Sequence, residues 1–262
     1  MKRRDLILAS AGILLPALGR AAQPCPPPQV TVSGGNSATT DCVTVTGSSY
    51  STSFDLTENP ITEGGKWVNG QSTGLQWSNV QTGSGNAYAS RLVDSGGVCR
   101  YCDPIAHLSA SFMAFSPNQY AQGTVYRVLG YQNPNGGHEI ELLLRFQITA
   151  NNARGYEVLW GQGGTIAIVR WNGGVGDYSD LTPYATGPNY SRPAVDGDVL
   201  RAEISGNTLV VKVNSSTVLT LDVSSGGALA TVNSGQPGIG FWPTPGSTLS
   251  SYGWKSFNAG SL

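Results

Sequence analysis

Apolar and polar residues alternate along the middle of the chain, in three runs between His138 and Trp171. In the first run, H-E-I-E-L-L-L-R-F-Q-I, one parity is apolar and consists of Ile140, Leu142, Leu144, Phe146 and Ile148. The other parity is mostly polar and consists of Glu139, Glu141, Leu143, Arg145 and Gln147. A period of two predicts a β-strand with a dry face and a charged face. The runs G-Y-E-V-L-W and T-I-A-I-V-R-W complete a predicted three-strand meander.

The rest of the chain also reads as short strands bounded by Gly, Asn and Ser. Gly206-Asn207 predicts a two-residue hairpin turn between strands at 199–205 and 208–214. Residues 107–115 predict another strand, and 252–257 predict a closing strand that returns to the start of the domain. No run of ten or more residues keeps a helical period. Charged residues are only 12 % of the 262, which suits one all-β unit with many turns.

Residues 1–22 predict an export signal, with basic residues from Lys2 to Arg4, an apolar run at 6–17 and small residues before the cleavage region. The apolar run is too short to anchor the chain in a bilayer, so no membrane span is expected after its removal. Arg3-Arg4 also fits a twin-arginine signal, which leaves two export routes open. Residues 23–49, rich in Pro, Gly and Ser, predict a collar or stalk, and 50–262 the main domain.

The charge balance argues against a nucleic-acid partner. The chain holds 15 Lys and Arg and 16 Asp and Glu, and residues 1–22 contain four of the basic and one of the acidic residues. The mature chain would therefore keep 11 basic and 15 acidic residues, a net charge of −4. Such a chain has no basic surplus to neutralise phosphates.

The four cysteines form two separated pairs in a chain predicted to be exported, which favours disulfides. Pairing of Cys25 with Cys42 and of Cys99 with Cys102 is the simplest of three possible connectivities. The C-R-Y-C spacing would also fit a redox motif or half of a zinc site. However, no helical pattern follows it and the sequence contains no second C-x-x-C.

A family resemblance is carried by the order of several motifs across residues 50–260: G-G-K-W, the three runs of the meander, G-D-V-L-R-A-E-I-S-G-N-T-L-V-V-K-V-N and G-Q-P-G-I-G-F-W. The chain resembles the concanavalin A-like lectin/glucanase superfamily and, more narrowly, its laminin-G-like modules. The resemblance implies an all-β, two-sheet antiparallel jelly-roll sandwich whose concave face often binds carbohydrate. It implies no required cofactor but a possible structural calcium ion, for which Asp55 and Asp222 are the candidates.

Two enzymatic hypotheses concern the charged parity of the first run. Glu139 and Glu141 lie about 7 Å apart on one face, and they match the first two places of the glucanase motif E-x-D-x-x-E or E-x-D-x-E. The third place falls on Leu144 or Leu143, so glycoside hydrolysis would lack its proton donor.

Alternatively, Arg145 and Gln147 would neutralise a uronate carboxylate in a polysaccharide lyase, with Tyr156 or a histidine as the base. This lyase is the preferred enzymatic alternative. An ion pair between Glu141 and Arg145 on a polar sheet face is the simplest structural interpretation.

The leading hypothesis is a non-catalytic carbohydrate-binding or adhesion module, exported to the periplasm, the cell surface or the medium, and monomeric. It rests on the polar parity and on aromatic residues in and after the meander, including a long segment at 172–198 that we expect to be ordered. The predicted ligand-binding residues are Glu141, Arg145, Gln147, Tyr156, Trp160, Arg170, Trp171, Tyr178 and Tyr184. A purely structural surface module is a third hypothesis.

Overall fold

The computed structural model describes residues 47–73, 77–92, 103–134, 137–182, 192–225 and 231–262, and the backbone of two further strands. The chain divides into two compact units, Met1–Thr46 and Gly47–Leu262. In the first unit, β1 (Gln29–Val32) pairs antiparallel with β2 (Asp41–Thr44), within the segment predicted as a collar or stalk. The predicted export signal and the four cysteine side chains lie outside the described residues.

The second unit contains a seven-stranded sheet in which every neighbouring pair is antiparallel. Its strands, in spatial order, are β12 (Tyr178–Asp180), β11 (Ile166–Trp171), β10 (Asn152–Gly161), β9 (His138–Thr149), β16 (Gln236–Pro243), β7 (Ile105–Leu108) and β4 (Trp67–Asn69). The predicted meander is therefore confirmed as β9, β10 and β11.

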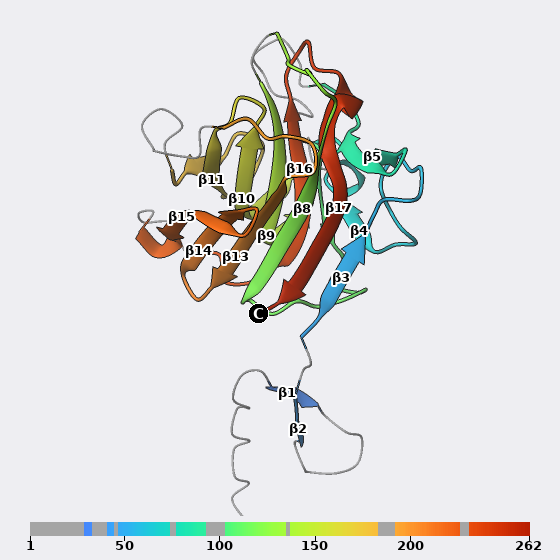
Figure 1. Ribbon diagram of the computed structural model, residues 1–262. Coiled ribbons are helices and arrows are strands. Elements are labelled where there is room, and N and C mark those ends of the chain that lie inside the picture. Colours follow the sequence, from blue (N-terminus) through green and yellow to red (C-terminus); the bar gives the residue numbers. More distant parts are fainter. Residues whose placement is uncertain are drawn as a thin grey trace, which may run out of the picture. The chain divides into compact units, whose positions relative to one another are not determined.

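An eight-stranded antiparallel sheet forms the second layer (Figure 1). Its strands, in order, are β15 (Ser216–Asp222), β14 (Thr208–Val213), β13 (Val199–Ser205), β8 (Gln119–Arg127), β17 (Tyr252–Ser261), β6 (Asn86–Ala89) and β5 (Val80–Gly83), and β3 (Ser49–Thr52) also pairs with β17. The all-β jelly-roll sandwich predicted from the sequence is confirmed.

Helical structure in the described residues is limited to three single turns, Gln71–Thr73, Val223–Ser225 and Leu249–Ser251. No helix in this part of the chain is long and apolar enough to cross a membrane.

The main core lies between the two sheets and is built from alternate residues of each strand. β9 and β10 contribute Ile140, Leu142, Leu144, Tyr156, Val158 and Trp160, all with no exposed surface. The opposite sheet contributes Ala121, Val125, Leu200, Ala202, Ile204, Leu209, Val211, Trp254 and Phe257. Each large side chain buried in this way contributes about 1.5–3 kcal/mol to folding, so the alternation read from the sequence fixes which face of the sheet turns inward.

A β-bulge at Arg145 interrupts that alternation in β9. Arg145 has a φ of 49°, and the register of β9 shifts against both neighbouring strands at this level. One extra residue reverses the facing of everything beyond it. Phe146 and Ile148 consequently pack with Leu143 in a second apolar cluster on the other side of the sheet. The predicted unbroken apolar parity from Ile140 to Ile148 is therefore wrong beyond the bulge.

Other strand predictions are confirmed or corrected by the turns around them. The hairpin is confirmed, since Ser205 pairs with Thr208 across the two-residue turn. The strand predicted at 107–115 ends instead at Leu108, because the backbone N–H groups of Phe112 and Met113 both donate to the Ser109 carbonyl and form a turn. Within the segment 172–198 the structure describes 172–182 and 192–198, including β12, while Tyr184 lies outside the described residues.

Candidate functional site

Several carboxylates gather on the outer face of the seven-stranded sheet, which is the face turned away from the main core. Glu139 and Glu141 come from β9, Glu157 from β10, Asp180 from β12, and Asp103 precedes β7. These five residues are called the acidic face below. The strand register places several of them near one another, and this proximity adds to the effect of burial, which raises the pKa of Glu141 and of Glu157.

The strand register explains how residues distant in sequence meet here. Asp180 pairs with Val169, Val169 with Glu157, and Glu157 with Leu143, so these four residues form one row across the sheet. Asp180 and Glu157 are then separated by two strand spacings, about 10 Å. Glu141 lies one row away from Glu157 on the adjacent strand, a diagonal that places Cα atoms about 7–8 Å apart.

Glu141 occupies the floor of the acidic face. Its side chain is 1 % exposed, and its Oε2 atom has no hydrogen-bond partner among the described residues. It pairs with Gly240 of β16, where an added Cβ atom would lie 2.1 Å from Oε2, so a larger residue at this position would require the carboxyl group to move. Burial raises the pKa of Glu141 well above its usual range, and the neighbouring Glu157, Asp103 and Glu139 raise it further.

Glu157 is held by a tryptophan. The indole Nε1–H of Trp171 donates to Glu157 Oε2 at 2.6 Å, and the glutamate is 4 % exposed. Burial raises the pKa of Glu157 to about 8, with further contributions from Asp103 and Asp180 that outweigh the opposite effect of the Trp171 bond. Glu157 is therefore largely protonated at neutral pH and can itself donate a hydrogen bond.

Asp103 and Trp77 form a second pair of a buried acid and a nearby tryptophan, close to β7. Burial raises the pKa of Asp103 to about 7, and the nearby Trp77 indole lowers it only in part. Trp77 Nε1 does not reach hydrogen-bond geometry with any acceptor in the described part of the chain. The Trp77 and Trp171 rings meet edge to face, with centroids 5.4 Å apart. Two tryptophans thus cover the buried acids and lower the polarity around them.

Solvent reaches the acidic face through its less buried members. Asp180 is exposed and Glu139 is half-buried. The Tyr178 ring is 50 % exposed and lies 5.4 Å from the Trp171 ring. Trp242, which pairs with Glu139 across β9 and β16, is also half-buried. Aromatic side chains therefore flank the acids at two levels of the sheet.

Arg145 has a different role from the predicted one. Its side chain is 2 % exposed and donates to three backbone carbonyl groups: Nε to Pro117 at 2.7 Å, Nη1 to Val232 at 3.1 Å and Nη2 to Gly206 at 2.7 Å. Among the described residues Arg145 makes no ion pair with Glu141, because the Glu141 carboxyl group lies on the outer face of the sheet. The predicted ion pair between Glu141 and Arg145 is therefore not formed. Arg145 also does not face the acidic face as a ligand contact, because the bulge turns its side chain away from that face.

Other predicted ligand residues also point inward. Tyr156 and Trp160 are fully buried in the main core, and Arg170 is 1 % exposed with its Nε donating to Asn172. Gln147 is exposed, but its amide donates to the Ser234 carbonyl at 2.7 Å. Of the predicted residues that the structure describes, Glu139, Glu141, Trp171 and Tyr178 meet on the outer face. Glu157, Asp103, Asp180, Trp77 and Trp242 join them without having been predicted.

Neither histidine is placed to act as a base. His107 Nδ1 bonds the Leu108 carbonyl, its Nε2 accepts from the Ile148 N–H, and burial lowers its pKa to about 4. His138 Nδ1 bonds the Tyr131 hydroxyl, and burial lowers its pKa to about 3. Both rings are therefore neutral at physiological pH.

The calcium candidates are exposed and carry local bonds: Asp55 accepts from Ser53, and Asp222 accepts from Ser224. In the described residues no group of three or more His, Cys, Asp or Glu side chains is arranged to hold a metal ion. Calcium binding stays a prediction from the resemblance.

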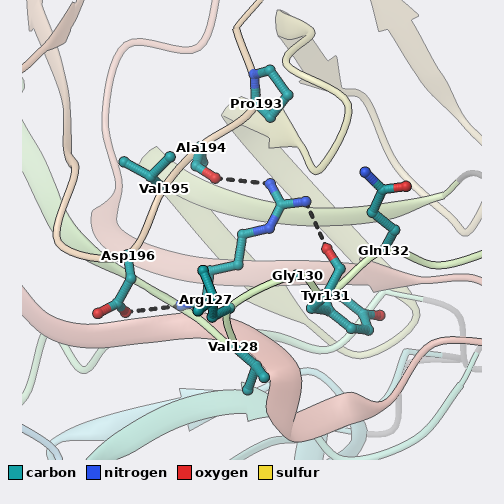
Figure 2. A pocket seen from close by; sticks show the side chains of 10 residues that line it. Arg127, Val128, Gly130, Tyr131, Gln132, Pro193, Ala194, Val195 and Asp196 are labelled. Atoms are coloured by element: carbon teal, nitrogen blue, oxygen red, sulfur yellow. Dashed lines mark hydrogen bonds between the residues drawn. The ribbon is translucent and has the colours of Figure 1, made fainter.

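A cavity of about 490 Å³ lies elsewhere, between the loop after β8 and the loop before β13 (Figure 2). Arg127 spans it and donates to the carbonyl groups of Gln162, Ala194 and Tyr131 at 2.8–3.0 Å. Asp196 accepts from the Arg127 backbone N–H and from Lys255. These groups bind one another and hold the loops together, which leaves the acidic face as the better candidate site.

Comparisons with known proteins bear on the fold. No protein-family model matches the chain, and a search of curated proteins finds no significant match. Solved structures do match. One, from work on endo-acting O-glycanases that members of the human gut microbiota express to initiate mucin breakdown, has a TM-score of 0.50 and 14 % identity, covering 81 % of this chain and 98 % of that chain.

Two further structures are similar at lower scores. They are a non-specific endo-β-1,3(4)-glucanase, SCLam, of family GH16 (TM-score 0.48, 9 % identity, 89 % of this chain and 94 % of that one) and the carbohydrate-binding module CBM66 from Bacillus subtilis (0.43, 14 %, 75 % and 92 %). The narrower laminin-G-like resemblance stays a prediction. The two antiparallel sheets and the match at 0.50 show that this chain has the concanavalin A-like jelly-roll fold.

Proposed function

We propose that the protein is an exported glycan-binding module whose ligand lies on the acidic face. The observation that carries the proposal is the Glu141 carboxyl group, which is 1 % exposed and keeps an unbonded Oε2 among the described residues. A buried polar atom without a partner costs about 1–3 kcal/mol. A site that retains such an atom between other carboxyl groups is suited to a ligand with hydrogen-bond donors.

Sugar rings supply such donors together with apolar faces. Hydroxyl groups donate to carboxylates, and a protonated acid such as Glu157 can donate in return. Trp242 and Tyr178 offer partly exposed aromatic surfaces on which a pyranose ring can pack. The similarity to the O-glycanase structure supports a glycan as the class of ligand.

The proposal is tested with the matched variants Glu141→Gln and Glu203→Gln. Both remove one carboxylate, but Glu203 lies on the eight-stranded sheet and pairs with Arg201 and Lys212. Binding to a panel of soluble polysaccharides is measured by affinity electrophoresis and calorimetry. We expect Glu141→Gln to weaken binding of the preferred polysaccharide about tenfold and Glu203→Gln to leave it unchanged. Absence of binding across the panel, or equal effects of the two variants, would refute the proposal.

Hydrolysis of a glycan is a second candidate, favoured by one observation. Glu157 pairs with Leu143, the position where the one-strand motif would carry its second acid. The neighbouring strand thus supplies a carboxyl group that β9 lacks. A protonated Glu157 would donate its proton to the leaving-group oxygen, while the half-buried Glu139, as an ionised carboxylate, would act on the sugar carbon or on a water molecule.

The lyase alternative has less support. The Arg145 guanidinium donates its hydrogen bonds to backbone carbonyl groups, so it is not placed to neutralise the carboxylate of a uronate. New reducing ends released from a polysaccharide by the wild type, and lost in Glu157→Gln, would establish hydrolysis. Unsaturated products that absorb ultraviolet light would establish a lyase instead.

A further inference from the structure

We infer that the acidic face selects glycans that carry a free, protonated amine, such as glucosamine or galactosamine residues without an acetyl group. The inference rests on the proposed function, since it names the class of glycan for the same site. It is drawn from the charges that surround the unbonded Glu141 oxygen.

Within the part of the chain that the structure describes, no cation is paired with the buried acids. Glu141, Glu157 and Asp103 form no ion pair within the described residues, and the groups that shift their pKa values are other acids and tryptophans. The arginines of β9 and β11 are engaged elsewhere. Arg145 is bonded to three carbonyl groups, and Arg170 is buried with its Nε bonded to Asn172. His107 shares the face, but it is neutral and both its ring nitrogens are bonded.

The Glu141 carboxyl group lies against the backbone of the neighbouring strand. Gly240 lies opposite Glu141, and any side chain there would collide with Oε2. The glycine thus lets the carboxyl group lie close to the β16 backbone, where its Oε2 atom has no partner among the described residues. An ammonium group brings three donors and one positive charge, so it can satisfy this oxygen and a second carboxylate together.

A cation gains more here than a hydroxyl group does. A neutral donor satisfies one acceptor and leaves the buried acids protonated, whereas an ammonium group also stabilises the ionised form of one of them, which releases its proton on binding. A charge-assisted hydrogen bond to a buried carboxylate improves affinity by about ten- to a hundredfold. Uronic acids and sulfated sugars would add to the repulsion, so the same face disfavours anionic glycans.

Access for the amine is provided by the exposed end of the row. Asp180 is exposed and Glu139 half-buried, and both lie on the same face as the buried acids. Surface acids of this kind attract a cationic ligand before it reaches the buried carboxylates. Partly exposed Tyr178 and Trp242 then give the sugar ring an apolar surface.

The experiment compares two matched pairs of ligands by calorimetry at about pH 6, where sugar amines are protonated. The pairs are β-1,4-linked glucosamine and α-1,4-linked galactosamine hexamers, each against its N-acetylated counterpart. We expect at least about tenfold tighter binding of one amine-bearing hexamer than of its acetylated partner. In Glu141→Gln this ratio should fall toward one, and in Glu203→Gln it should persist.

Thermal unfolding of each variant establishes that it is folded, and Glu157→Gln serves as a second test if Glu141→Gln is not. Equal binding of the amine-bearing and acetylated hexamers would overturn the inference while leaving glycan binding in place. Binding of neutral polysaccharides but not of amine-bearing glycans would also overturn the inference while leaving glycan binding in place. Absence of binding to every glycan would remove the proposed function as well.

Discussion

Glu157 makes the stability of this protein depend on pH in a direction opposite to that of most acids. Because its folded-state pKa is about 8, against an ordinary value of 4.5, the folded protein holds a proton on Glu157 that the unfolded chain releases. The contribution of Glu157 to the free energy of unfolding is fully present below about pH 4.5 and is lost as the pH rises toward 8. The predicted effect is therefore a fall in stability on the alkaline side of neutrality.

Two histidines limit the range in which this effect can be read. The folded-state pKa values of His107 and His138 are lowered to about 4 and about 3, so these buried rings add stability as the pH rises to about 6.5, where the unfolded histidines lose their protons. Above pH 6.5 the two histidines together add less than about 1 kcal/mol, because half of the unfolded imidazoles are still protonated at that pH. The acids are then the groups whose titration differs most between the folded and unfolded states.

The expected size follows from the part of the shift that lies above pH 6.5. Each pKa unit corresponds to about 1.4 kcal/mol, so the interval from 6.5 to a pKa of about 8 makes Glu157 account for about 2 kcal/mol. Asp103, with a pKa of about 7, adds less than about 1 kcal/mol. After the opposite contribution of the histidines is subtracted, the wild type should lose about 2 kcal/mol between pH 6.5 and pH 8.5.

Glu157→Gln tests this reasoning, because the amide oxygen can still accept from Trp171 but carries no titrating proton. Urea unfolding at half-unit pH steps from 6.5 to 8.5 should show a clearly flatter dependence than in the wild type. Glu203→Gln is the control. Burial raises the pKa of Glu203, but hydrogen bonds from Lys212 and Arg201 outweigh this and lower it, so the group stays ionised throughout the range. A wild-type stability that is constant over these two pH units would refute the argument.

Further variants probe the bulge, the glycine and the aromatic surface. Arg145→Ala leaves three carbonyl groups without a donor and should destabilise the protein by about 3 kcal/mol in urea unfolding, without a specific change in glycan affinity. Gly240→Ala forces the Glu141 carboxyl group to move, and should cost about 1–3 kcal/mol and reduce glycan affinity in calorimetry. Trp242→Ala should weaken glycan binding about tenfold while the unfolding temperature changes by only a few degrees, because this side chain is half-buried.

The sandwich was accessible from the sequence because alternation is a local signal. The parity of Ile140, Leu142 and Leu144 needs no knowledge of partners, and the structure buries all three between the sheets. Alternation does not predict the facing of residues beyond Arg145, because β9 contains one extra residue there relative to both neighbouring strands. Nothing in the letters L-R-F marks Arg145 as a bulge, since its conformation is set by pairing with strands on both sides.

Predicting the acidic face would have required the pairing register of the strands, which the sequence alone does not contain. The parity of G-Y-E-V-L-W already places Glu157 opposite Tyr156 and Trp160, so the side of the sheet that it faces was readable. Its position beside Glu141 was not, because it depends on which residue of β10 meets which residue of β9. Asp103 and Trp77 were harder still. They lie outside the meander and reach the acids only through the order of strands in the sheet.

The bulge in β9 also decides the electrostatic sign of the outer face. In an uninterrupted strand, Arg145 would share a face with Glu139 and Glu141, and its guanidinium would neutralise one of them. The extra residue removes that positive charge to the loops at the strand end and puts the Phe146 side chain on the outer face instead. A single backbone irregularity thus separates charges that the sequence lists side by side. Deleting Phe146, which restores the two-residue alternation after Leu144, should place Arg145 on the outer face, where its guanidinium would neutralise one of the acids.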